Sequence, residues 1–238
     1  MRRGLTKLEP FFRKAYSLQT CQQKLTLMTV TSVTEAIANR VKYMPKGKPF
    51  ARAVFAQMGS RTSVDKALSR LVRLGLLERI VRGVYMRPKF NKYVGSFVRP
   101  SPTSVMHVIT KSNGETTQIH GSEAVRRFGL STQMQMQPVY YTSGSTRVLK
   151  VGKALVHLKH VSSDRLQFAG TKVGLALVAL HYVGKEGLST QVIAKITNGL
   201  SSEELIKLRA CRMPKWMRSM LTRATDERVV PSTAPPPH

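Results

Sequence analysis

The stretch Ser60–Gly75, SRTSVDKALSRLVRLG, constrains the fold more than any other part of this chain. At 100° per residue five apolar side chains fall on one side of a helix, namely Val64, Ala67, Leu68, Leu71 and Leu74. The other side is nearly all cationic and carries Lys66, Ser69, Arg70 and Arg73. Thr62 and Asp65 have the spacing of a capping box, and Gly75 supplies a left-handed end. We therefore predict an amphipathic helix whose outer face binds an anionic partner.

The charge balance of the whole chain indicates what kind of partner this is. The 238 residues include 39 Lys and Arg against 12 Asp and Glu, a formal net charge of +27. A chain this basic favours a polyanion such as nucleic acid. No apolar run approaches the roughly 18 residues of a membrane helix, so we expect no membrane partner. Two cysteines, Cys21 and Cys211, make no disulfide framework and indicate free thiols in a reducing cytoplasm.

Further elements on either side of the basic helix complete a familiar order. Ser32–Glu35 has capping-box spacing and begins a helix with apolar Val33, Ala36, Ile37, Val41 and Met44, which Pro45 ends. Residues 50–58 predict a second, short helix. Residues 77–81 and 84–86 predict two strands joined by Arg82-Gly83, where Gly83 permits a positive φ. Helix, helix, helix and hairpin predict a winged helix-turn-helix domain over residues 32–92.

The basic side chains of this domain are the candidate DNA contacts. Between Ser32 and Lys92 there are fourteen Lys and Arg against three acids. The predicted recognition helix offers Arg61, Thr62, Lys66, Ser69, Arg70 and Arg73, since Arg pairs with guanine edges while Lys and hydroxyls suit phosphates. The hairpin adds Arg79 and Arg82, and the turn after the first helix adds Lys46 and Lys48 for the DNA backbone. We assign Asp65 to the helix cap. The alternative is a solvated basic face in an ordinary domain.

The remainder of the chain predicts a second domain and two irregular ends. Pro88–Pro102 holds three prolines and a glycine and is predicted to be a joint. Helices are expected at 102–111 and 123–128, strands at 138–142, 147–151 and 154–160, and helices at 171–183, 189–196, 201–211 and 214–224. The fold class is therefore α+β, with a mixed domain over 93–224 that ends in a helical bundle. Residues 1–31 are expected to be a disordered extension, with the true start at Met1 or Met28, and 225–238 a disordered tail.

The inventory of reactive side chains favours a binding protein over an enzyme. His157 and His160 are three apart on a predicted strand and so lie on opposite faces, which makes them poor metal co-ligands. The sequence contains no zinc motif and no phosphate-binding loop, and acids are sparse after Pro100. We expect no catalytic residues, no metal and no cofactor. His120-Gly121-Ser122 would either bind an anion or contain a serine cap, and Trp216 would serve in the core or in a partner contact.

Several motifs resemble a known family. Residues 37–40 (IANR), 44–47 (MPKG), 59–61 (GSR), 64–73 (VDKALSRLVR) and 82–85 (RGVY) resemble the amino-terminal module of AbiEi-like antitoxins. Residues 100–102 (PSP), 129–133 (GLSTQ) and 213–217 (MPKWM) are similar to the second half of that family. The resemblance runs from about Ser32 to Ala224. Residues 1–27 and the Pro-rich tail depart from it.

The resemblance implies a bacterial antitoxin of a type IV toxin–antitoxin system, of the abortive-infection kind. Such a protein would repress its own operon through the winged-helix domain, as a homodimer or as cooperating monomers on double-stranded operator DNA. Its second domain would counteract a nucleotidyltransferase toxin, with or without binding it directly. It would lie in the bacterial cytoplasm, associated with the nucleoid.

Two alternatives remain open from the sequence. The first is a stand-alone winged-helix transcriptional regulator whose second domain senses a ligand or assembles subunits. The second is a basic RNA- or ribosome-associated protein, suggested by the charge of +27. RNA-binding modules usually stack bases on exposed aromatic side chains, and the predicted groove-facing surface has none, which disfavours the second alternative.

Overall fold

A computed structural model describes residues 32–226, and the expected extension at 1–31 lies outside them, as do residues 227–238 of the expected tail. The fold is α+β, as predicted. Contacts divide the chain into two compact units. Unit 1 holds the described chain up to Lys48 together with Arg52–Arg79 and Tyr85–Val98; unit 2 holds Pro49–Ala51, Ile80–Val84 and the chain from Arg99 onward.

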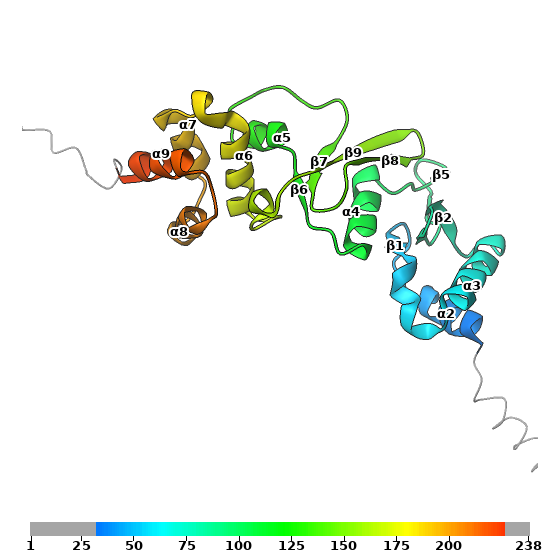
Figure 1. Ribbon diagram of the computed structural model, residues 1–238. Helices are drawn as coiled ribbons and strands as arrows, with labels where there is room; N and C mark the ends of the chain where they lie inside the picture. The colour runs from blue at the N-terminus through cyan, green and yellow to red at the C-terminus, as the bar shows by residue number, and fades with distance from the viewer. Residues whose placement is uncertain (1–31, 227–238) are drawn as a thin grey trace, which may run out of the picture. The chain divides into compact units, whose positions relative to one another are not determined.

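Unit 1 is built on three helices, α2 (Val33–Lys42), the 3-10 helix η1 (Arg52–Met58) and α3 (Arg61–Arg73), which contact one another (Figure 1). Ser32 caps α2 by accepting a hydrogen bond from the Glu35 N–H at 3.2 Å, at the predicted start of that helix. The predicted cap of α3 is wrong by two residues. Ser60, not Thr62, accepts from the Ser63 N–H at 3.2 Å, because the chain is still extended at Ser60.

The predicted apolar face of α3 is confirmed except at its end. Val64, Ala67, Leu68 and Leu71 are each at most 2% exposed, whereas Leu74 is 70% exposed. Leu74 is the residue at which the helix stops, and Gly75 follows with φ of +70°, so the chain turns away before Leu74 reaches the core. Ile37 of α2 and Phe55 of η1, both fully buried, complete this core.

Three short strands form a sheet in the order β1-β3-β2, from β1 (Pro49–Ala51), β2 (Glu78–Val81) and β3 (Val84–Met86). The predicted hairpin is confirmed, with Gly83 at φ of +79° in its turn. The helix predicted from Phe50 is wrong at its beginning, because Phe50 is buried within β1 and the helix starts at Arg52. Residues 80–84 group with unit 2, where Val84 is buried with Val105 and Val151.

The Pro-rich joint contains regular structure. Strands β4 (Phe90–Asn91) and β5 (Ser96–Phe97) form a small antiparallel hairpin in unit 1. Asn91 shapes its turn, since its side chain accepts from the Tyr93 N–H at 3.0 Å and its carbonyl accepts from the Gly95 N–H at 2.9 Å. The sequence prediction missed this hairpin because each strand is only two residues long.

Unit 2 contains a four-stranded sheet in the order β6-β7-β9-β8. The three predicted strands are confirmed as β7 (Val139–Thr142), β8 (Arg147–Val151) and β9 (Ala154–His160), and β6 (Thr117–Ile119) was not predicted. Strand β7 pairs parallel with β9, and the other two pairs are antiparallel. Helix α4 (Pro102–Ser112) packs on one face, where Met106 is buried with Val156 and Leu158.

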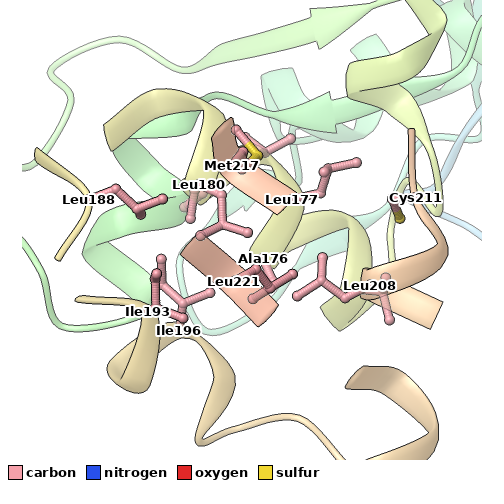
Figure 2. Close-up of a cluster of buried hydrophobic side chains, with 14 of the residues drawn as sticks. Ala176, Leu177, Leu180, Leu188, Ile193, Ile196, Leu208, Cys211, Met217 and Leu221 are labelled. Atoms are coloured by element: carbon pink, nitrogen blue, oxygen red, sulfur yellow. The ribbon is translucent and has the colours of Figure 1, made fainter. Parts of the chain in front are cut away.

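The remaining helices of unit 2 form its larger core. They are α5 (Gly121–Arg127), α6 (Lys172–Gly187), α7 (Thr190–Thr197), α8 (Ser202–Ala210) and α9 (Lys215–Asp226), close to the predicted ranges. Figure 2 shows side chains of α6 to α9 converging, with Leu177 and Leu180 of α6 among Ile193, Leu208 and Leu221. The first half of helix α6 is buried from Val173 to Leu180 apart from the half-buried Leu175, so this stretch is the central element of the core. None of the described helices is long and apolar enough to cross a membrane.

Candidate nucleic-acid interface

The outer face of α3 brings together four of the predicted DNA-contacting side chains. Lys66, Ser69, Arg70 and Arg73 are all exposed and, with Asp65, line one open hollow of about 470 Å³ along the helix. Their spacing of three or four residues places them on neighbouring turns of the same face. Among the described residues, neither Lys66 nor Arg73 has a salt-bridge partner, so their charges stay available for an anion.

Asp65 is the one acid on this surface, and its charge is neutralised. Arg52 of η1 approaches both carboxylate oxygens of Asp65, with its Nη1 at 3.2 Å from Oδ1 and 3.0 Å from Oδ2. The predicted capping role of Asp65 is therefore wrong, because Ser60 caps the helix and Asp65 instead joins α3 to η1. The pairing leaves the outer face of α3 with a net positive charge.

Arg70 is held toward the start of helix α2. Its Nη1 lies 3.4 Å from the hydroxyl oxygen of Thr34 in α2, which makes a long hydrogen bond. Gly59, just before α3, also lies close to the start of α2. A Cβ added to Gly59 would lie 3.0 Å from the Val33 side chain. Helix α3 therefore crosses α2 near the amino-terminal end of α2. Local sequence patterns carry no signal for the contact with Thr34, because it joins residues 36 positions apart.

The predicted backbone contacts Lys46 and Lys48 are both exposed in the turn after α2. This turn is ordered by Arg87, whose Nη1 donates to the carbonyl oxygens of Lys42 at 2.7 Å and Met44 at 2.6 Å. The Gly47 N–H in turn donates to the Arg87 carbonyl oxygen at 2.9 Å. Arg87 is thus a structural residue rather than a free cation, and sequence reasoning did not identify it.

The other predicted contacts are exposed but are not gathered into the α3 hollow. Arg61 and Thr62 lie in the first turn of α3, where the Thr62 hydroxyl is 3.1 Å from the Ser60 hydroxyl of the cap. Arg79 of β2 is exposed and belongs to unit 1, whereas Arg82, at the exposed turn of the hairpin, groups with unit 2.

The candidate anion site in unit 2 is instead a helix cap. His120, not Ser122, caps α5, because the His120 Nδ1 accepts from the Ser122 N–H at 3.3 Å. The His120 ring packs at 4.8 Å from Tyr141 and 5.6 Å from Tyr182, measured between ring centroids. Burial, helped by the charge of Lys159, lowers the pKa of His120, which favours the neutral ring that a cap acceptor needs.

Other reactive side chains of unit 2 are engaged in structure. His157 bonds Gln137 and His160 bonds the Gly144 carbonyl oxygen at 2.8 Å, so the two rings have separate partners. Within residues 32–226 no group of three His, Cys, Asp or Glu is placed to hold a metal ion. Cys211 is a free thiol, and its burial raises its pKa. Trp216 is partly buried and packs against the α6–α9 core.

Comparison with known families places the chain in one of them. The model of a family of unknown function, DUF6088, matches residues 36–208, which is well over half of the chain. The chain belongs to the DUF6088 family. The DUF6088 match includes the whole of α3 and the sheet of unit 2. No curated protein matches the chain.

Proposed function

We propose that this protein is a DNA-binding autoregulator of the antitoxin type, in which residues 32–92 act as a winged helix-turn-helix module. The single observation that supports the proposal is the outer face of α3, where Lys66, Arg70 and Arg73 are exposed opposite an apolar face that is buried except at Leu74. An exposed 13-residue helix with clustered Lys and Arg suits a major groove. The exposed Lys46 and Lys48 would hold the DNA backbone beside it.

The antitoxin part of the proposal extends this DNA-binding role to the whole chain. It is supported by the motif resemblance in both halves of the sequence, and it assigns to unit 2 the suppression of a nucleotidyltransferase toxin encoded nearby. The protein itself would perform no chemistry and need no metal or cofactor. It would act in the bacterial cytoplasm at its own operator, as a homodimer or as cooperating monomers.

Fluorescence anisotropy with the duplex upstream of its own gene tests the DNA-binding part. If about five phosphates are neutralised, log affinity falls against log salt with a slope of about −4 to −5. We expect Arg70→Ala to reduce the preference for the upstream duplex over random DNA, and Lys46→Ala to weaken both equally. Affinity that is indifferent to both salt and sequence would refute DNA binding, and the reverse pattern of the two variants would show that another face binds DNA.

Co-expression of the full chain with the neighbouring nucleotidyltransferase tests the antitoxin part. Wild-type protein should restore growth and repress a reporter fused to the upstream region. Arg70→Ala should lose repression while it still restores growth, because the proposed antitoxin role lies in unit 2. Repression without any rescue of growth would favour a stand-alone transcriptional regulator.

A further inference from the structure

The β4–β5 hairpin exposes an unusual concentration of apolar side chains. Phe90 is 53% exposed, Tyr93 100%, Val94 70% and Phe97 55%, all within eight residues. Phe90 and Phe97 are direct cross-strand partners whose ring centroids lie 5.4 Å apart in an edge-to-face arrangement. Their contact orders the hairpin, but it leaves about half of each ring in water. Exposed apolar groups gathered in this way mark a binding surface.

The residues around these side chains are basic, which indicates the chemistry of the partner. Lys89 and Lys92 flank Phe90 and are exposed. Lys89 also packs over the turn that carries Lys46 and Lys48, since an added Cβ at Gly47 would lie 3.2 Å from the Lys89 Cδ. A second copy of this chain, with its formal net charge of +27, would be repelled here. A polyanion that also offers apolar surface, as DNA does at its sugars and base faces, fits both properties.

The position of the hairpin within unit 1 favours a duplex. Helix α3 crosses α2 near the amino-terminal end of α2, as the contact between Arg70 and Thr34 shows. The hairpin instead adjoins the turn at the carboxyl end of α2, where Gly47 bonds Arg87 and Val98 bonds Lys89. Ten residues of helix separate the two ends by about 15 Å. Half a turn of B-DNA is about 17 Å, which is the offset between a major groove and the following minor groove.

We propose that the β4–β5 hairpin is a second DNA-contacting element that inserts Tyr93 and Val94 into the minor groove flanking the site bound by α3. Apolar side chains that enter a minor groove act as wedges that partly unstack a base step, while neighbouring lysines bind the phosphates on either side. Tyr93 and Val94 lie in the hairpin turn and are the most exposed of the four, so they form the wedge. Phe90 and Phe97 form its base. This inference rests on the proposed DNA-binding function.

The test uses the full chain and two duplexes of the upstream region, one limited to the core site and one with about ten further base pairs on each side. We expect wild-type protein to bind the longer duplex about tenfold more tightly. Tyr93→Ala combined with Val94→Ala should remove that gain, whereas Tyr93→Phe should retain it because the ring is preserved. Ile206→Ala, at a 67% exposed side chain in α8, is the matched control and should behave as wild type.

A 2-aminopurine base in the flank reports the wedge directly, because its fluorescence rises when its neighbours unstack. Wild-type protein should raise this signal, and the double variant should not, while thermal unfolding shows that both are folded. Equal flank-dependent affinity in the double variant and wild type would overturn the inference and leave the proposed function standing. Tighter, Tyr93-dependent binding to a single strand of the same sequence would also overturn it. Wild-type protein that binds neither duplex preferentially over random DNA would refute the proposed function itself.

Discussion

Removing the positive charge from the outer face of α3 gives the most direct measure of its contribution to DNA binding. The perturbation is the triple variant Lys66→Ala, Arg70→Ala and Arg73→Ala. All three side chains are exposed, and Ala is the best helix former, so the fold of unit 1 should be preserved. Loss of the 3.4 Å contact between Arg70 and Thr34 should cost well under about 1 kcal/mol of stability at this exposed position.

The magnitude follows from counterion release. Each phosphate contact changes the slope of log affinity against log salt by about −0.9. At 0.15 M salt, relative to 1 M, one contact therefore raises the affinity about fivefold. Three contacts together amount to about 150-fold, or about 3 kcal/mol of binding free energy. The slope should become shallower by about 2.7. Neighbouring charges share the same phosphates, so the loss of affinity can be smaller than about 150-fold. It should still exceed the roughly fivefold loss expected for one contact.

The assay is a salt series of anisotropy titrations on the upstream duplex, with a second triple variant as control. Lys150→Ala, Lys153→Ala and Lys195→Ala remove the same total charge from exposed positions of unit 2. If only net charge matters, both triple variants should lose the same affinity. We expect the control to lose less than about threefold, because these lysines are not among the proposed DNA contacts and exposed charges without a direct phosphate contact act only through screened interactions. Equal losses in the two variants would refute the assignment of α3 as the contact surface.

Three further predictions concern the surroundings of this surface and the stability of each unit. Asp65→Ala should raise DNA affinity a few-fold, because it removes the one acid from the α3 hollow, whereas Arg52→Ala should lower DNA affinity by leaving that carboxylate unpaired. Anisotropy titrations measure both changes. Each variant should lose under about 1 kcal/mol of folding stability, because the ion pair is partly exposed. Phe55→Ala should lower the unfolding free energy of unit 1 by about 3–5 kcal/mol, measured by urea denaturation, since the ring is fully buried; a loss under about 1 kcal/mol would contradict that burial. The hydrogen bond from Arg126 holds the pKa of Glu123 at about 2, so its contribution to stability is complete above its ordinary value of 4.5 and is lost as the pH falls from there toward 2. Glu123→Gln should therefore flatten the decline in thermal stability over that range, and an unchanged pH profile would count against the ion pair.

The elements that local patterns specify were predictable. Helix α3 has a continuous 3.6-residue apolar period and ends at a glycine, and strands β7 to β9 alternate or run apolar between turn residues, so their approximate ranges could be predicted. The errors lie where a neighbour outside the window decides the conformation. Phe50 belongs to a strand because β3 pairs with β1, and the two-residue strands β4 and β5 exist only through their mutual pairing.

For the candidate DNA-binding surface, too, some features follow from local spacing and others depend on long-range contacts. That Lys66, Arg70 and Arg73 share one face follows from their spacing alone, and the structure brings them to one hollow. That Asp65 is neutralised could not be predicted, since its partner Arg52 lies thirteen residues away on another element. Thr62 has the spacing of a capping box in the sequence. Ser60 is the actual cap, because its extended backbone places its hydroxyl oxygen where it accepts from the Ser63 N–H.

The sequence by itself determined the α+β class, the amphipathic basic helix and the excess of positive charge, because periodicity, capping residues and composition act over a few neighbouring residues or over the chain as a sum. Only the tertiary structure decided that Arg87 orders the Lys46–Lys48 turn, that His120 caps α5, and that Phe90, Tyr93, Val94 and Phe97 are left in water. Burial and long-range pairing depend on which segments meet in space, and residues 36 or 45 positions apart in the chain carry no local signal of that meeting.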